Sequence, residues 1–188
     1  MHPATSCFTF LLCFMTTICF SQSEKLVTAL DSARYFSQEG KTAYSLGDFQ
    51  KATSYFEKST AIFEKEGSPE EIYTEYNQLG NAFSMTGKIK EALDSYLLSV
   101  KFSEKAKDSL NLAKVTKNIG TLYSEQKNFP QAMEYYEIAL KYAQNLEDKL
   151  VKADCLNNIG VVYEQQEQYE KAITAYSQAE IFYLEDKN

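Results

Sequence analysis

Apolar side chains recur along most of the chain at the spacing of one face of an α-helix. Residues 68–107 contain two such stripes, separated at Gly87 by a residue that can take the left-handed conformation in which helices end. The first stripe follows Ser68 and Pro69, and Glu71 stands three residues after the serine, which is the spacing of a capping box. The pattern therefore predicts two helices joined by a short turn.

The same pattern returns every 40 residues. Glycine marks one column, alanine the position twelve residues later, and Phe or Tyr the position sixteen residues later. These columns are Gly40, Gly80, Gly120, Gly160; Ala52, Ala92, Ala132, Ala172; and Phe56, Tyr96, Tyr136, Tyr176. A fixed period of this length is the signature of a repeat array. We expect four antiparallel helix pairs, over about residues 28–67, 68–107, 108–147 and 148–187.

The glycine column needs an explanation, because glycine inside a helix costs about 1 kcal/mol relative to alanine. We expect each glycine to face the alanine of the second helix, so that the two backbones approach closely. The aromatic side chain then fills the space beyond, and its burial contributes roughly 1.5–3 kcal/mol. Glycine and alanine columns are thus predicted to be packing devices.

These columns resemble the tetratricopeptide repeat, in which Leu-Gly-x-x-Tyr precedes an alanine and an aromatic residue. The match is carried by Leu79-Gly80, Ile119-Gly120 and Ile159-Gly160, whereas in the first unit Glu39 precedes the glycine. The period of 40 exceeds the usual 34, as in the long-helix variants of this superfamily. The resemblance implies an all-α, right-handed α-solenoid of antiparallel helix pairs over residues 23–188.

The resemblance also implies a concave face lined mainly by the first helix of each unit. Positions six and three residues before the glycine, and one and four after it, would face this groove, and most are polar. The candidate peptide-binding residues are Asn77, Asn81, Lys114, Lys117, Thr121 and Asn157. The alternative is a solvated face that keeps the array soluble. A clamp for a C-terminal carboxylate is not carried over, because Asp154 and Asn158 stand where Lys and Arg belong.

The first 23 residues contain no Asp, Glu, Lys or Arg. The apolar run from Phe8 to Phe20 is shorter than the roughly 20 residues that span a bilayer, and its length fits a secretory signal. Cys19-Phe20-Ser21 supplies small residues before a cut at Gln22, although the segment lacks an N-terminal Lys or Arg. Residues 1–22 are predicted to be a signal peptide, or alternatively an uncleaved membrane anchor. The expected location is exported, periplasmic or secreted.

Charge and reactive residues narrow the chemistry. The net charge of −7 disfavours nucleic acid and anionic membranes as partners. After cleavage the chain has no histidine and a single cysteine, Cys155, which we expect to be buried and inert. Without a phosphate-binding loop or a metal motif, we expect no enzyme activity and no cofactor or metal.

The sequence therefore predicts a non-catalytic, exported scaffold that binds a protein or peptide. The alternative is the N-terminal sensor region, or a remnant of one, of a bacterial signalling protein of the histidine kinase or transcriptional regulator type. Ile181, Phe182 and Leu184 would have no following helix to cover them. We therefore expect either a fragment of a longer protein or self-association through the C-terminal helix.

Overall fold

The computed structural model describes residues 28–186, so the predicted signal peptide at residues 1–22 lies outside the described part. Helices are the only regular secondary structure within residues 28–186. An N-terminal helix covers residues 28–45, and it is followed by α2 (Phe49–Glu66), α3 (Pro69–Met85), α4 (Ile89–Ala106), α5 (Ser109–Glu125), α6 (Phe129–Ala143), α7 (Leu150–Gln165) and α8 (Tyr169–Glu185).

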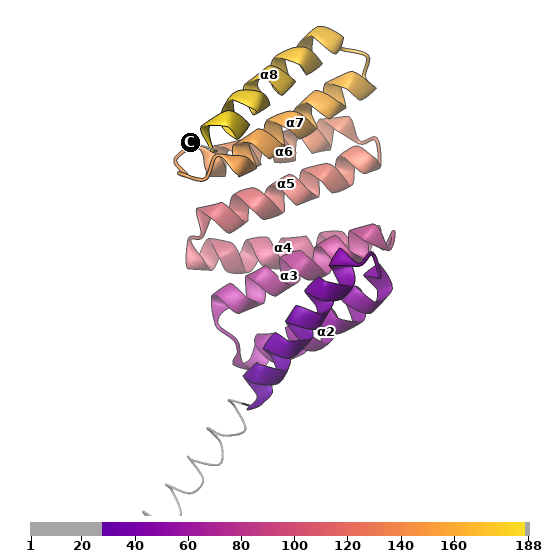
Figure 1. Cartoon of the computed structure of the whole chain (residues 1–188), viewed down its shortest axis with the longest axis vertical. Coiled ribbons are helices and arrows are strands. Elements are labelled where there is room, and N and C mark those ends of the chain that lie inside the picture. Colours follow the sequence, from indigo (N-terminus) through magenta and orange to yellow (C-terminus); the bar gives the residue numbers. More distant parts are fainter. Residues whose placement is uncertain (1–27, 187–188) are drawn as a thin grey trace, which may run out of the picture.

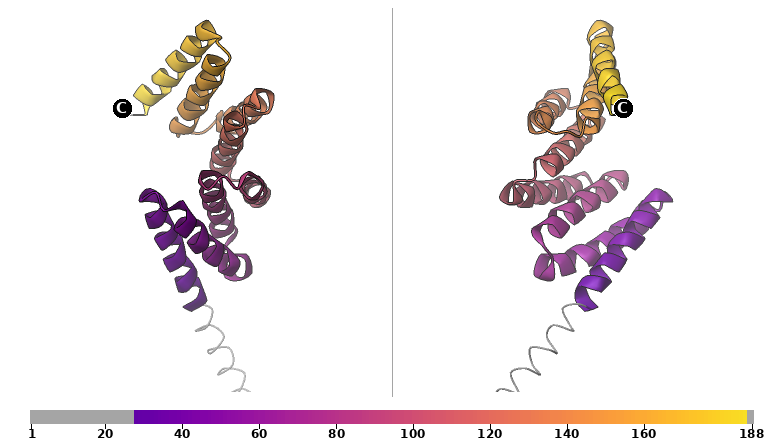
Figure 2. Two further views of the ribbon diagram at one scale, coloured as in Figure 1. Left: turned by 90° about the vertical axis from the view of Figure 1, so that its right-hand side faces the viewer. Right: turned by 60° about the vertical axis from the view of Figure 1, so that its left-hand side comes forward.

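The helices stack as successive hairpins along the long axis of the molecule (Figure 1). We call the N-terminal helix, α3, α5 and α7 the A helices, and α2, α4, α6 and α8 the B helices. From α2 onward each helix packs against the next, and in addition α3 contacts α5 and α5 contacts α7. The side view in Figure 2 shows the stack bending, so that the first and last hairpins lie to one side of the middle ones. The predicted all-α solenoid is confirmed.

Local sequence sets the helix ends. The Ser68 hydroxyl accepts the Glu71 N–H, and the Glu71 carboxylate accepts the Ser68 N–H at 2.9 Å, which completes the predicted capping box before α3. Gly87 has a φ of +75°, as expected for the left-handed residue of the turn into α4. Lys127 and Glu167 take the same conformation in the turns before α6 and α8. The hairpin turn therefore keeps its geometry without an obligatory glycine.

The nearest neighbour of each glycine is the aromatic side chain sixteen residues later. A Cβ added to Gly80 would lie 2.5 Å from the ring of Tyr96, and the other three glycines meet their aromatic side chains in the same way. At Gly120 the predicted alanine is also close, since the Ala132 carbonyl oxygen would be 3.2 Å from the added Cβ. The aromatic ring lies directly on the glycine, because removing the Cβ lets the ring reach the A-helix backbone. All four alanines are buried at the helix contact.

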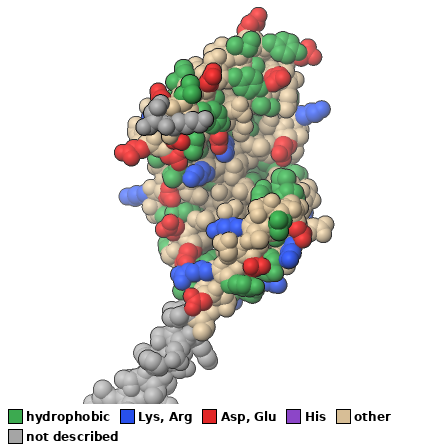
Figure 3. Space-filling view, in the orientation of Figure 1, with side chains coloured by type: hydrophobic (Ala, Val, Ile, Leu, Met, Phe, Trp, Pro, Cys, Tyr) green, Lys and Arg blue, Asp and Glu red, His purple; other side chains and the backbone are tan. Residues whose placement is uncertain are grey.

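Within the described residues, no helix is both long enough and apolar enough to cross a lipid bilayer. Charged side chains of both signs are spread over the face seen in Figure 3, and hydrophobic side chains gather at the end formed by α7 and α8. Exposed residues at this end include Tyr169, Ile173, Ile181 and Leu184.

Candidate functional site

A row of polar contacts joins each A helix to the next, with the two partners 37 to 41 residues apart in the sequence. We call it the polar row. Its contacts are Arg34–Glu71, Ser37–Glu75, Asn77–Asn118, Asn81–Asn118, Lys117–Asp154 and Thr121–Asn158. Four of the six predicted groove residues therefore hydrogen-bond within the protein. The polar row ties neighbouring units together, which a simple solvated face would not do.

Three asparagines form the centre of the polar row. The Asn118 side-chain amide donates to Oδ1 of Asn77 at 3.0 Å and to Oδ1 of Asn81 at 3.1 Å, and the Tyr96 hydroxyl donates to Asn81 Oδ1 at 2.8 Å. Asn118 thus uses both of its N–H groups, and Asn81 uses both lone pairs of its oxygen. The Nδ2 groups of Asn77 and Asn81 have no partner among the described residues. We call Asn77, Asn81 and Asn118 the amide cluster.

The amide cluster borders a cavity of about 240 Å³. Asn81, Asn118 and Thr121 line it together with Tyr44 and Ser84. Four of these five residues stand at the positions that the repeat pattern assigns to the groove, and Asn118 is the addition. The cavity places the open amide N–H side of the cluster near space that a ligand can enter.

We call the contacts between successive A helices the first, second and third junctions. At the third junction, between α5 and α7, the charged side chains pair with each other. Lys117 Nζ lies 2.8 Å from Asp154 Oδ2, and the Tyr183 hydroxyl donates to Asp154 Oδ1 at 2.9 Å. Because the Lys117 side chain is only 19% exposed and already paired, its charge is largely used inside the array. Lys114 is exposed and Asn157 is half-buried, and the side chain of neither forms a hydrogen bond to another described residue.

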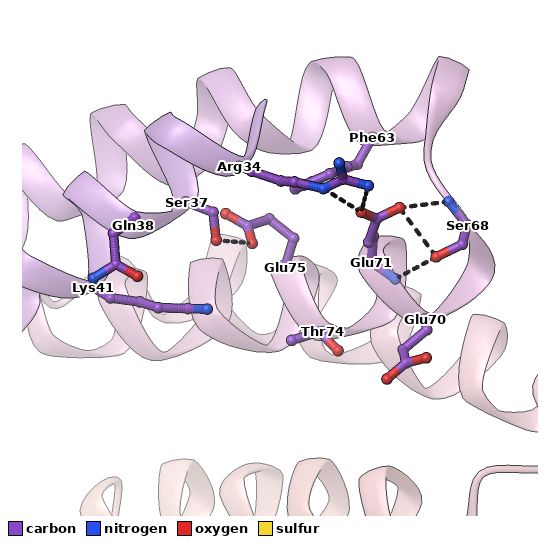
Figure 4. Close-up of a pocket in the computed structure, with 10 residues that line it drawn as sticks. All are labelled: Arg34, Ser37, Gln38, Lys41, Phe63, Ser68, Glu70, Glu71, Thr74 and Glu75. Atoms are coloured by element: carbon purple, nitrogen blue, oxygen red, sulfur yellow. Dashed lines mark hydrogen bonds and ion pairs between the residues drawn. The ribbon is translucent and has the colours of Figure 1, made fainter. Parts of the chain in front are cut away.

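A larger cavity, of about 610 Å³, lies between the N-terminal helix and α3 (Figure 4). Groove positions of the first two units line it, but so do carboxylates that the sequence reasoning missed. Its charged and hydroxyl-bearing lining includes Arg34, Ser37, Lys41, Glu70, Glu71 and Glu75. This first junction is therefore the most charged part of the candidate groove.

One wall of the cavity carries an ion pair. Arg34 donates to Glu71 Oε1 through Nε at 3.1 Å and through Nη2 at 2.9 Å, and its Nη1 lies 3.7 Å from Asp31. Burial alone would raise the pKa of Glu71, but the Ser68 N–H and the Arg34 guanidinium outweigh it and hold that pKa below its usual value. Glu71 is thus an ionised, fully engaged carboxylate.

Glu75 is the unexpected residue of the cavity, because its side chain is only 2% exposed. The Ser37 hydroxyl donates to Glu75 Oε2 at 2.8 Å, and the Ser59 hydroxyl is hydrogen-bonded to the other carboxyl oxygen. Burial raises the pKa of Glu75, and the two hydroxyls and the more distant Lys41 only partly oppose this. The neutral form of the carboxyl is therefore favoured over a wider pH range than in an exposed glutamate.

The sequence held a signal for Glu75 that the search for groove positions passed over. At the period of 40, the same column contains Tyr35, Glu75, Val115 and Cys155. Val115 and Cys155 are fully buried, so the position belongs to the core in the two later units. A charged residue in a core column was the anomaly to look for.

The remaining chemistry agrees with a binding role. Cys155 is fully buried and unpaired, and burial raises the pKa of its thiol to about 12, which confirms the prediction of an inert cysteine. Across residues 28–186, no group of three His, Cys, Asp or Glu side chains is arranged to hold a metal ion.

Comparison with solved structures shows the same solenoid fold. The chain resembles BtubC (BKLC) from P. vanneervenii with a TM-score of 0.72 and 22% identity. The match covers 83% of this chain and 65% of BtubC. RapI in its apo form gives 0.74 at 17% identity, over 84% of this chain and 58% of RapI. MamA gives 0.60 at 18% identity, over 87% of this chain and 86% of MamA. The chain thus spans less than two thirds of the length of BtubC and RapI.

The sequence itself gives the family. No curated protein sequence matches the chain significantly. Models of the tetratricopeptide repeat match residues 33–66, 70–145 and 111–180, which together cover more than half of the chain. With the stacked helix pairs and the glycine–aromatic contacts described above, these matches show that the chain belongs to the tetratricopeptide repeat family.

Proposed function

We propose that this protein is a non-catalytic scaffold that binds an extended segment of a partner protein along the A helices. Tetratricopeptide repeats and the solenoid neighbours support a protein-interaction scaffold in general. The observation that carries the specific proposal is the amide cluster. Its hydrogen bonds fix the side chains of Asn77 and Asn81 and leave their N–H groups without a partner among the described residues, and Asn81 also lines a cavity.

The chemistry of the amide cluster suits a peptide backbone. An extended peptide offers carbonyl oxygens that are unsatisfied unless they meet donors, and the Nδ2 groups of Asn77 and Asn81 are donors without a protein partner. Because Asn118 already holds both oxygens in place, little side-chain entropy remains to be lost on binding. Asn157 and Lys114 extend the same face toward the later units.

A peptide-binding assay tests this proposal. A library of labelled peptides is screened for binders by fluorescence anisotropy, and each binder is compared between the unchanged protein and the triple variant Asn77→Ala, Lys117→Ala, Asn157→Ala. The matched control is Lys90→Ala, Gln131→Ala, Ser177→Ala, three exposed positions on B helices. We expect at least a tenfold loss for the A-helix variant and less than a twofold change for the control, with helicity unchanged in both. Equal effects of the two variants would contradict the proposal.

Export is a second part of the proposal, and it rests on the uncharged, apolar N-terminal segment. The full-length chain is expressed in a bacterium, and the soluble envelope fraction is analysed by intact mass. We expect a product that begins at Gln22. A product that retains Met1 in the membrane fraction would favour the anchor, and retention of Met1 in the cytoplasm would contradict export.

The C-terminal end supports a second candidate. Ile173 is 64% exposed on α8, whereas its counterparts Leu93 and Met133 are partly buried against core clusters that include residues of the next A helix. An apolar face of this kind is suited to a second copy of the chain, or to a following segment if the array is a sensor region, or a remnant of one, in a bacterial signalling protein.

Sedimentation distinguishes these uses of the end. We expect self-association at tens of micromolar, which Ile173→Asp abolishes and Ser177→Asp, on the same helix, leaves intact. A monomer at that concentration would remove self-association and leave the sensor-region reading as the second candidate.

A further inference from the structure

We infer that the 610 Å³ cavity of the first junction receives a lysine or arginine side chain of the partner segment, with Glu75 as its counter-ion. The inference rests on the proposed peptide-binding function and names the chemistry that one subsite selects. It starts from a carboxyl group in a place where the repeat normally has core.

The fold does not require a carboxyl group at this position. In the next two units the same position holds Val115 and Cys155, and both are fully buried. Taking a carboxylate out of water is costly, and a well-packed apolar residue at a buried ionic position is often neutral or stabilising by about 1–4 kcal/mol. Glu75 is therefore better explained by what it binds than by what it does for packing.

The charge balance of the cavity selects a cation. The cavity is lined by Arg34 and Lys41 against Glu70, Glu71 and Glu75, and the guanidinium of Arg34 is held by Glu71. Lys41 forms no ion pair with a described acidic residue, and it alone stands against the two remaining carboxyls. An ammonium or guanidinium group is therefore attracted once Glu75 is ionised, because Lys41 alone then stands against Glu70 and Glu75.

Every element around Glu75 is accounted for. The N-terminal helix presents Ser37 and Lys41, α2 presents the uncharged Ser59 and Phe63, and α3 itself carries Glu71, which is already paired with Arg34. Among the charged side chains that line the cavity, Lys41 acts most clearly on Glu75, and it lowers the pKa that burial raises. A bound cation would therefore be the largest change in the electrostatic environment of this carboxyl.

The hydroxyl of Ser59 indicates the state of the empty cavity. Ser59 Oγ has one proton but two acceptors in reach, the Phe56 carbonyl oxygen at 3.0 Å and Glu75. Both contacts are satisfied when Glu75 is protonated and donates to Ser59, while Ser59 donates to Phe56. A cation that enters the cavity favours the ionised carboxylate, so binding is coupled to release of a proton.

One residue of the cavity lining lies on the same face of α3 as two residues of the amide cluster. Thr74 lines the cavity, and Asn77 and Asn81 follow it on the same face of α3 at helical spacing. Glu75 and Asn81 are six residues apart, which is about 9 Å along the helix axis. That distance corresponds to roughly three residues of an extended peptide. A basic residue about three positions from the segment held by the amide cluster would reach Glu75.

The test uses acetylated, amidated hexapeptides in which one position is fixed as Lys, Arg, norleucine or Glu and the others are randomised. Binding of each pool is measured by anisotropy with the unchanged protein, Glu75→Gln and Glu75→Val, and with Glu137→Gln as the control that removes an exposed carboxylate on α6, away from the cavity. We expect the Lys and Arg pools to bind at least tenfold more tightly than norleucine. Glu75→Gln and Glu75→Val should abolish that preference, and Glu137→Gln should change it less than twofold.

Titration calorimetry in two buffers of different ionisation enthalpy gives an independent readout, since we expect proton release with the unchanged protein and none with Glu75→Gln. A preference for Lys and Arg that survives in both Glu75 variants would overturn the inference, and so would equal binding of the norleucine pool. Either result leaves the scaffold proposal standing if the peptides still bind. A protein that binds none of the pools would overturn both proposals.

Discussion

The first and second junctions of the array share a backbone arrangement but differ in what fills it. In both, a glycine of the A helix carries the aromatic ring of its hairpin partner, Gly80 with Tyr96 and Gly120 with Tyr136. The A helix entering the first junction places Glu75 in the core column, whereas the next A helix places Val115 there. The glycine–aromatic contact is thus the same in both hairpins. The position of Glu75 and Val115, by contrast, can hold either a hydrogen-bonding or an apolar side chain.

The largest effect on stability is expected when the glutamate of the first junction is introduced at the equivalent position of the second. Val115→Glu would replace a fully buried valine with a carboxyl group. We expect a loss of at least about 3 kcal/mol in the free energy of unfolding at pH 7, because the substitution overpacks a filled core position and takes a charge out of water. Urea denaturation followed by circular dichroism measures it. A loss below 1 kcal/mol would mean that the two junctions are equivalent environments.

The constant part of the comparison is tested by Gly120→Ala. The new Cβ would lie 2.7 Å from the Tyr136 ring and 3.2 Å from the Ala132 carbonyl oxygen, so the ring must move. Overpacking of this kind costs about 1–3 kcal/mol, and the better helix propensity of alanine returns about 1 kcal/mol. We expect a net loss of up to about 2 kcal/mol in urea denaturation. Ser177→Ala, in the exposed part of a helix, serves as the control, and a stabilised Gly120→Ala protein would refute the close contact.

The reverse exchange, Glu75→Val, is expected to stabilise the protein by about 1 kcal/mol at pH 7. The folded-state pKa of Glu75 is raised, so the wild-type contribution is fully present below the ordinary glutamate pKa and is lost as pH rises through the folded value. The advantage of Glu75→Val should therefore grow between pH 4 and pH 8. Thermal and urea unfolding at several pH values measure it, with Glu70→Gln as the control. An advantage that shrinks as pH rises would contradict the account.

The smallest effect is expected for Arg34→Ala at the wall of the first junction. Its side chain is 57% exposed, and surface ion pairs of this kind contribute about 0–1 kcal/mol. We expect less than 1 kcal/mol, decreasing further in 0.5 M salt because exposed charges are screened. A salt-independent loss of several kcal/mol would show that the Arg34–Glu71 ion pair, rather than Glu75, determines the stability of this junction.

The helices and their stacking were accessible from the sequence because local signals repeat there. Four copies of one pattern make each weak indicator, such as the box at Ser68 or the turn at Gly87, consistent with the others. The direct contact of the glycine with the aromatic ring was not predicted, because spacing shows which residues share a helix face, but not which atoms fill the gap between two helices. That contact depends on the rotamer of the aromatic ring.

The site was predicted less completely. The repeat pattern selected the face that carries Asn77, Asn81 and Thr121, but it did not reveal that these side chains bond to the following A helix. Most of the polar row joins residues 37 or 38 apart, a few less than the repeat period. This offset depends on how neighbouring units pack and cannot be predicted from one unit. Glu75 was missed because a stripe of apolar residues was sought and its interruption was ignored.

The carboxyl of Glu75 itself provides the most direct measurement. Its side-chain ¹³C resonance, assigned by its loss in Glu75→Gln, can be followed by NMR from pH 3 to pH 9 in the unliganded protein. We predict that Glu75 remains protonated at pH values where the exposed glutamates have already ionised. A Glu75 resonance that titrates with the exposed glutamates, or below them, would contradict the claim that a neutral, buried carboxyl occupies a core position at the first junction.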